Sequence, residues 1–282
     1  MSYTIEQILD EAGDLVSLPE ICVRVNALID DPDSSMADVA AVIAQDPALT
    51  ARMLRMANSV FYGLVSKVDS VDRAAAVIGM SKIRDLVMAT SVAETLPNDV
   101  FTMDAFWQHS IYCGLIAKAI AVETRKGQGD SLFVAGLLHD IGQLVMFHTV
   151  RDLVSEALIA SVEEPNEPPI YKIERKLIGF DHCQLGVALA KKWQLPDMLC
   201  TCIEFHHEPE KADVFGDEVA ATHVANSLAY LAEIKSDDLE DAPPIQPAAM
   251  ETLGLNEESL LALIDGVQAE FSEVKSLLFS SN

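Results

Sequence analysis

Helix start signals recur along this chain, and they constrain its fold class more than any other feature. Thr4 with Gln7 forms a capping-box pattern, and Ser35 with Asp38 can cap a further helix. No segment alternates as a half-buried strand does, and only 6% of the 282 residues are aromatic. The sequence therefore predicts an all-α protein made of many short helices.

The predicted helices fall into two subdomains. Residues 1–98 form a set of short helices, and residues 97–99 (PND) are the expected joint. Residues 99–282 form the second subdomain, which begins with a long helix at about 103–125. Further helices are expected at about 170–178, 182–193, 197–207 and 216–234, then an acidic, Pro-rich linker at 235–247 and a last helix from about 256.

The charge balance limits the partners of this chain. A net charge of -25 leaves no positive footprint for nucleic acid and disfavours anionic membrane surfaces. Basic proteins and divalent cations are compatible with it. The first residues lack a basic start and an apolar run, and no stretch reaches about 18 uninterrupted apolar residues. We therefore expect a cytoplasmic protein without membrane insertion.

Two sets of apolar residues have structural interpretations. The five cysteines contain no CxxC pair, and we expect buried thiols in a reducing compartment: Cys22, Cys113, Cys183, Cys200 and Cys202. In the last helix an apolar stripe follows a 4-3-4-3-4 spacing: Leu260, Ile264, Val267, Phe271, Val274 and Leu278. We expect the stripe to pack on its own domain, with a partner surface as the alternative.

Residues 136–142 (GLLHDIG) carry the clearest chemical signal. His139 and Asp140 interrupt an apolar segment, which we expect to form one helix capped by Asp130. A buried carboxylate there needs a cation or hydrogen-bond donors, because an unpaired buried charge costs several kcal/mol. The pair is therefore a candidate for metal binding.

Four more histidines complete the candidate site: His109, His182, His206 and His207. Imidazole nitrogens and carboxylate oxygens are ligands for divalent transition metals. Each histidine also has a simpler interpretation. His109 can be a hydrogen-bonded core residue, His182 can belong to a helix cap with Asp181, and the 206–207 pair can be a solvated helix end.

The two remaining histidines, His148 and His223, are expected to be hydrogen-bonded core residues rather than ligands.

Residues 18–231 resemble the HDOD family, bacterial signalling proteins related to the HD and HD-GYP metal-dependent phosphohydrolases. The shared motifs are Leu18-Pro19, residues 45–50 (QDPALT), 54–59 (LRMANS), 76–79 (AVIG), 107–110 (WQHS) and 135–142 (AGLLHDIG), Asp181-His182 before Gly186, Trp193 with Leu195-Pro196, and His206-His207. The resemblance implies an all-helical fold with an HD-like second half.

The resemblance also implies a ligand set. HD phosphohydrolases bind metal through a His, a His-Asp pair and a later Asp, which match His109, His139 with Asp140, and Asn226. Two-metal relatives add histidines that match the remaining three candidates, His182, His206 and His207. We therefore expect one or two divalent transition metal ions, of iron, manganese, nickel or zinc. These donors do not distinguish strongly among the four metals.

Three departures from the catalytic relatives stand out. Asn226 replaces a charged ligand, and Gln143 stands where cyclic-dinucleotide phosphodiesterases have a Lys. A Lys would place a positive charge near the scissile phosphate. The Gly-Tyr-Pro element of those enzymes is also absent after the paired histidines. These losses argue against cyclic-dinucleotide hydrolysis, and no residue is assigned as catalytic with certainty.

Two functions stay open at this point. The first is a signal-transduction protein with protein partners and a metal site that lacks robust catalysis, for which a nucleotide is a conceivable ligand. The alternative is a metal-dependent phosphohydrolase of a nucleotide or phosphodiester, with His139 and Asp140 as the catalytic pair. The sequence has no G-x-S-x-G, P-loop or dinucleotide-binding motif for other chemistry.

Overall fold

The structure, a computed structural model, describes residues 3–13, 19–59, 62–63, 67–95, 101–127, 129–162 and 168–279. No strand occurs within these ranges, which confirms the all-α prediction. The expected joint at 97–99 and the loop at 163–167 lie outside the described residues.

The first part of the chain consists of short helices. They are α1 (Ile5–Ala12), α2 (Glu20–Asp30), α3 (Met36–Ile43), α4 (Pro47–Ala57), α5 (Val71–Ile78) and α6 (Met80–Thr95). Both predicted caps are present, and both are capping boxes: Thr4 with Gln7 before α1 and Ser35 with Asp38 before α3. The side chain of each cap accepts a bond from a backbone N–H that has no partner inside the helix.

The second part begins with the long helix that the sequence predicts. Its elements are α7 (Phe101–Thr124), α8 (Gly129–Leu138), α9 (Ile141–Thr149), α10 (Arg151–Val162), α11 (Ile170–Leu177), α12 (His182–Lys192), α13 (Asp197–Phe205), the 3-10 helix η2 (Pro209–Lys211), α14 (Gly216–Ile234), the 3-10 helix η3 (Leu239–Asp241), α15 (Pro247–Leu253) and α16 (Glu257–Phe279). Neither α10 nor α15 was predicted.

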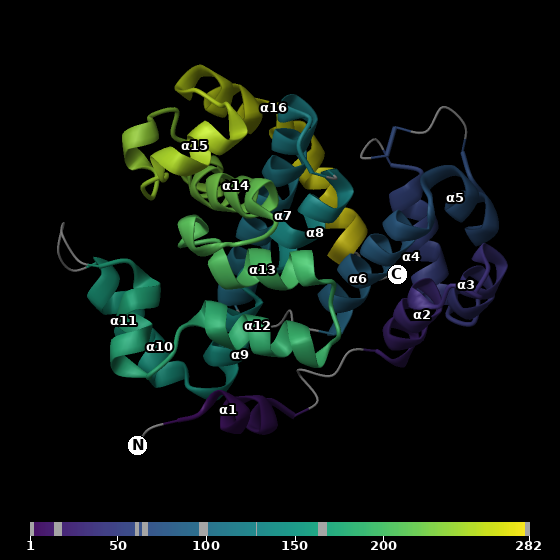
Figure 1. Cartoon of the computed structure of the whole chain (residues 1–282), viewed down its shortest axis with the longest axis horizontal. Coiled ribbons are helices and arrows are strands. Elements are labelled where there is room, and N and C mark those ends of the chain that lie inside the picture. Colours follow the sequence, from purple (N-terminus) through teal and green to yellow (C-terminus); the bar gives the residue numbers. More distant parts are fainter. Residues whose placement is uncertain are drawn as a thin grey trace.

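Helices α7, α8 and α14 lie at the centre of the second part, with α2 to α6 grouped to one side (Figure 1). Helix α1 packs against α9 and α12, far along the sequence. Helix α16 packs along α7 and also contacts α4 and α6, so the C-terminal helix touches both groups. One continuous apolar core includes residues from both.

The apolar stripe of α16 is covered by the protein itself. Five of its six side chains are buried, and the ring of Phe271 stacks on Tyr112 of α7, with centroids 4.1 Å apart and planes 9° from parallel. The prediction of packing on its own domain is confirmed. The stripe is therefore not available as a partner surface.

Judged by length and composition alone, the segment Gly129–Thr149 could cross a membrane. However, 78% of the tested window is buried inside the protein, which is typical of a core helix.

The prediction of one helix across 136–142 was wrong. The chain breaks between α8 and α9, and Asp140 has non-helical angles, φ -100° and ψ 14°. The Nδ1 atom of His139 bonds to the carbonyl oxygen of Gly136, 2.7 Å away, and so satisfies a carbonyl at the end of α8. The break lets His139 and Asp140 project differently from neighbours on a regular helix.

Asp130 does not have its predicted role as a helix cap. It lies within the first turn of α8 and forms ion pairs with Lys82, at 2.7 Å, and Lys118, at 3.6 Å. A carboxylate in a first helical turn is also favoured by the helix dipole.

Candidate metal centre

The structure brings all seven predicted ligand positions together. They come from the middle of α7, the break between α8 and α9, the start of α12, the end of α13 and the middle of α14. The residues are His109, His139, Asp140, His182, His206, His207 and Asn226.

The glycines of residues 136–142 explain how these elements come so close. A Cβ on Gly136 would lie 2.6 Å from the backbone nitrogen of Gly114 on α7. A Cβ on Gly142 would overlap the carbonyl oxygen of His182 and lie 2.7 Å from the nitrogen of Gly186 on α12. Real Cβ atoms do not tolerate such contacts. Glycine at both positions therefore permits the two helix crossings that position the site.

The first cluster contains His109, His139, Asp140 and Asn226. The Nε2 atom of His109 lies 2.9 Å from Oδ1 of Asn226, and Nε2 of His139 lies 3.3 Å from Oδ2 of Asp140. The rings of His109 and His139 have centroids 5.3 Å apart. One ligand atom each from His109, His139 and Asp140 fits within a span of 4.8 Å.

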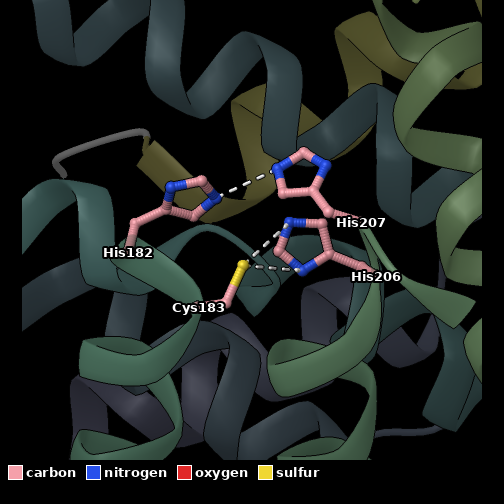
Figure 2. Close-up of side chains that lie close together, drawn as sticks. All are labelled: His182, Cys183, His206 and His207. Carbon is pink, nitrogen blue, oxygen red and sulfur yellow. Dashed lines mark hydrogen bonds between the residues drawn. The ribbon is translucent and has the colours of Figure 1, made fainter. Parts of the chain in front are cut away.

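The second cluster contains His182, Cys183, His206 and His207, whose side chains converge in Figure 2. The Nε2 atoms of His182 and His207 are 3.1 Å apart. Asp140 links the two clusters, because its Oδ1 atom lies 3.3 Å from Nε2 of both His182 and His206.

Four of the histidines have Nδ1 hydrogen bonded away from the centre. The acceptors are Glu233 for His109 (3.1 Å), the Gly136 carbonyl for His139 (2.7 Å), Glu174 for His182 (2.6 Å) and the Ile203 carbonyl for His206 (3.0 Å). In the neutral tautomer each Nε2 then carries a lone pair directed inward. Such outer partners are typical of metal-binding histidines, whose ring orientation they fix.

Two of the inward atoms have ion-pair contacts at 3.3 Å but no hydrogen bond. His139 Nε2 and Asp140 Oδ1 are buried without a hydrogen bond. Buried polar atoms nearly always have a hydrogen bond, so these two atoms of the first cluster need an explanation. A cation between the lone pairs would satisfy both. The donor set, imidazoles plus one carboxylate, fits a divalent transition metal.

Protons compete with a cation for the same positions. Burial opposes charge on His139, but Asp140 and Cys113 raise its pKa well above the ordinary value. Burial also opposes charge on Asp140, yet His139, His206 and His182 hold its pKa well below the ordinary value. Protonated histidines thus compensate the charge of the Asp140 carboxylate, and a bound metal would do the same.

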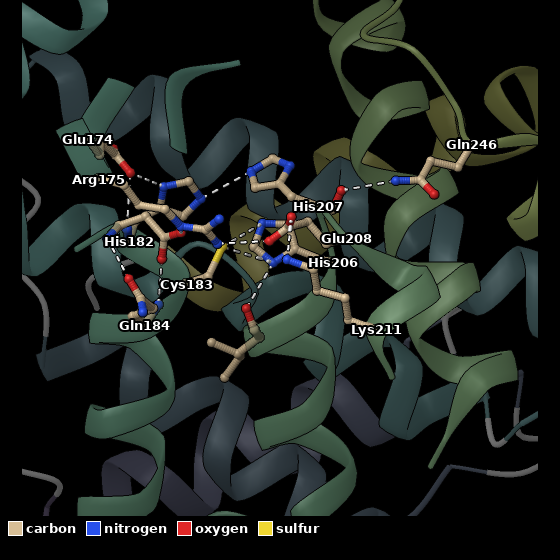
Figure 3. A network of polar contacts seen from close by, with 12 residues as sticks. Glu174, Arg175, His182, Cys183, Gln184, His206, His207, Glu208, Lys211 and Gln246 are labelled. Carbon is tan, nitrogen blue, oxygen red and sulfur yellow. Dashed lines mark hydrogen bonds and ion pairs between the residues drawn. The ribbon is translucent and has the colours of Figure 1, made fainter. Parts of the chain in front are cut away.

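A polar rim surrounds the second cluster (Figure 3). Arg175 pairs with Asp181 (2.5 Å) and Glu208 (2.8 Å), and its guanidinium lies 5.1 Å from the ring centre of Tyr171. Tyr171 in turn stacks on His207 at 4.8 Å. The rim therefore fixes the position of the His207 ring. Asp181 also forms the predicted cap of α12 with Gln184.

Three of the simpler interpretations can now be assessed. His206 is fully buried, so the solvated helix end is wrong for that residue. His223 is a core residue as predicted: Nδ1 donates to the His206 carbonyl, and Nε2 accepts from the backbone N–H of Gln246. His148 is exposed near the end of α9, so its predicted core role was wrong.

Sequence reasoning missed three residues of the centre: Cys183, Glu174 and Glu233. Glu174 is 1% exposed and accepts from both the backbone N–H and Nδ1 of His182. No spacing relates Glu174 or Glu233 to the histidines they support. Cys183, by contrast, directly follows His182. It was interpreted as a buried core thiol, so its place beside the histidines was not predicted.

The comparison with protein families identifies the chain. Residues 15–209, more than half of its length, match the model of the HDOD domain. The chain belongs to the HDOD family. The recognised motifs and the all-α fold agree with this assignment.

Solved HDOD structures share the fold. An HDOD domain protein with unknown function from Geobacter sulfurreducens is 26% identical, with a TM-score of 0.75 over 98% of this chain and 97% of that chain. A protein provisionally described as a phosphohydrolase, from Shewanella amazonensis SB2B, is 22% identical, with a TM-score of 0.75 over 96% and 98%. At that identity the likeness shows the fold alone.

A curated relative, an uncharacterized protein from Treponema pallidum (strain Nichols), is 25% identical over 225 residues. The alignment covers 78% of this chain and 43% of the relative. This HDOD chain therefore spans less than half the length of that relative.

Proposed function

We propose that this HDOD protein is a cytoplasmic signal-transduction protein that holds a divalent transition metal in its HD-type centre without robust catalysis. The ions would be held by His109, His139, Asp140, His182, His206 and His207, with the weaker amide oxygen of Asn226. Iron, manganese, nickel and zinc all suit these donors.

The main support for a centre without robust catalysis is its burial. His139, His182 and His206 are each 0% exposed, and Asp140 is 8% exposed. A phosphoester must reach its metal and nucleophile, whereas a structural metal needs no access. Asn226 and Gln143 also lack charges that phosphodiester cleavage would use.

The signalling role rests on the family and on exposed surface away from the centre. Val23 on α2 and Val77 on α5 are 47% and 57% exposed, so apolar side chains are available on the first helical group. We propose that protein partners bind there rather than at the stripe of α16. The state of the buried centre would reach this group through α7, α8 and α6, which pack in sequence.

A second candidate function is a metal-dependent phosphohydrolase. The six retained His and Asp positions favour it, as does the description of the protein from Shewanella amazonensis. A bound metal would supply Lewis-acid stabilisation of phosphate oxygens. In this function His109 and His207, which are less buried than the other ligands, lie where a substrate could approach.

The two functions can be separated with metal-loaded protein. Phosphodiesters and nucleotides are assayed with the wild-type chain and with Asp140→Asn, after circular dichroism shows that both are folded. The proposal predicts no turnover that depends on Asp140. Phosphate release that Asp140→Asn abolishes would contradict it and establish the phosphohydrolase.

A further inference from the structure

Cys183 has no place in the ligand set that the family resemblance implies, yet its sulfur lies inside the centre. The Sγ atom is 3.9 Å from Nε2 and 4.0 Å from Nδ1 of His206. The residue is 2% exposed. Figure 2 shows the thiol directed from the start of α12 toward the His206 ring, between His182 and the α13 end.

Three imidazoles surround this sulfur. One ligand atom each from His182, Cys183, His206 and His207 lies within 4.8 Å of every other. Ligand atoms on a tetrahedral zinc ion lie about 3.3–3.7 Å apart, given Zn–N bonds near 2.0 Å and a Zn–S bond near 2.3 Å. The pair of His182 and His207, at 3.1 Å, is slightly closer than this spacing. A pair of atoms at the 4.8 Å limit must come closer by about 1.1–1.5 Å.

The orientation of the rings supports a site rather than a chance contact. Nδ1 of His182 and of His206 are bonded to Glu174 and to the Ile203 carbonyl, so their Nε2 lone pairs face the cluster. His207 is held by stacking on Tyr171. The nearby Asp140 Oδ1, buried and without a hydrogen bond, adds negative charge beside the same space.

We infer that Cys183 supplies a thiolate ligand, so that the second cluster is a three-imidazole, one-thiolate site for a thiophilic divalent ion. This inference rests on the proposed metal centre and makes it more specific. Thiolate ligands favour zinc, whereas manganese prefers oxygen ligands. The second cluster should therefore prefer zinc to manganese, a selectivity that a His and Asp site lacks.

The other cysteines provide matched controls. Cys113 on α7 influences His139 of the first cluster, so it is a thiol near the centre but outside the second cluster. Cys200 on α13 is buried, and its thiol bonds to the Leu195 carbonyl, 3.6 Å away. The Cys113→Ser and Cys200→Ser variants remove a thiol without touching the second cluster.

The test uses cobalt(II), which reports thiolate ligation through a sulfur-to-cobalt charge-transfer band in the near ultraviolet. The full metal-free chain is titrated with cobalt(II). We expect the band in wild type, Cys113→Ser and Cys200→Ser, and its loss in Cys183→Ser. We also expect Cys183→Ser to weaken zinc binding by at least about tenfold, with manganese binding nearly unchanged.

Two results would overturn the inference: a charge-transfer band that survives Cys183→Ser, or cobalt(II) bound with no such band in wild type. The second leaves the proposed metal centre intact, because cobalt(II) still binds through nitrogen and oxygen. No cobalt(II), zinc or manganese binding at all would refute the metal centre itself.

If Cys183→Ser does not fold, X-ray absorption of zinc-loaded Cys113→Ser gives the answer. A Zn–S distance near 2.3 Å supports the thiolate, and a shell of nitrogen and oxygen only refutes it.

Discussion

The Nε2 atoms of His182 and His207 lie 3.1 Å apart inside the protein. Nδ1 of His182 already bonds to Glu174. Burial and the rings of His206 and His182 hold the pKa of His207 well below its ordinary value, so His207 is neutral near pH 7. A proton on either Nε2 atom, or a shared cation, satisfies both nitrogens. The pair is thus arranged for a cation that displaces one proton.

Glu174 should control metal affinity although it is not a ligand. Its carboxylate orients His182 by accepting from two of its nitrogens. The Glu174→Gln variant keeps the size of the side chain and one acceptor oxygen, but it loses the negative charge of the carboxylate. Loss of such an outer partner weakens metal binding by about 10- to 100-fold. Isothermal titration with zinc measures this. Glu156→Gln, an exposed position on α10, should match wild type, and equal affinity in both variants would refute the role of Glu174.

Gly142 should be intolerant of a side chain because α9 and α12 cross there. A Cβ would overlap the His182 carbonyl, so Gly142→Ala must push the helices apart. We expect a loss of about 1–3 kcal/mol in the free energy of unfolding, measured by urea denaturation, and weaker metal binding.

The control for this prediction is Gly266→Ala, in the middle of α16. A Cβ there meets nothing within 4 Å. Replacing a helical glycine by alanine should raise stability by about 0.5–1 kcal/mol. If both variants lose stability equally, the crossing is not what constrains Gly142.

Asp85 on α6 should make stability depend on pH, independently of the metal centre. Burial raises its pKa from 3.8 to about 6, against the hydrogen bond from Ser131. The folded state then binds the proton more tightly than the unfolded chain. The resulting stabilisation is fully present below about pH 4 and is lost as the pH rises through about 6.

Asp85→Asn removes this dependence, because an amide stays neutral and can still accept from Ser131. At pH 8 the variant should be more stable than wild type by about 1–3 kcal/mol, and the difference should shrink below pH 4. Urea denaturation at pH 4, 6 and 8 tests this, with exposed Asp72→Asn as control. A difference that is constant with pH would contradict the account.

Most helices could be predicted because their ends are set by local chemistry. The caps at Thr4 and Ser35 act within a few residues of the chain. The break between His139 and Asp140 could not be predicted, because the apolar pattern continues through it. The bond from the His139 ring to the Gly136 carbonyl, which accompanies the break, is visible only in three dimensions.

The candidate ligands could be predicted from the family motifs. That their side chains lie together is seen only in the fold. Glu174 and Glu233 could not be found, since tertiary packing alone brings each to its histidine. Cys183 was within reach of sequence reasoning, because it is adjacent to His182. A buried cysteine is usually a small apolar residue, and that interpretation was preferred.

The central claim is that the HD-type centre binds a transition metal. Elemental analysis of protein purified without an affinity tag, from cells grown with sufficient metal, tests it most directly. The account predicts near-stoichiometric iron, manganese, nickel or zinc in wild type, and a marked loss in Asp140→Asn but not in exposed Asp69→Asn. Wild-type protein that is folded and contains only traces of every transition metal would contradict it.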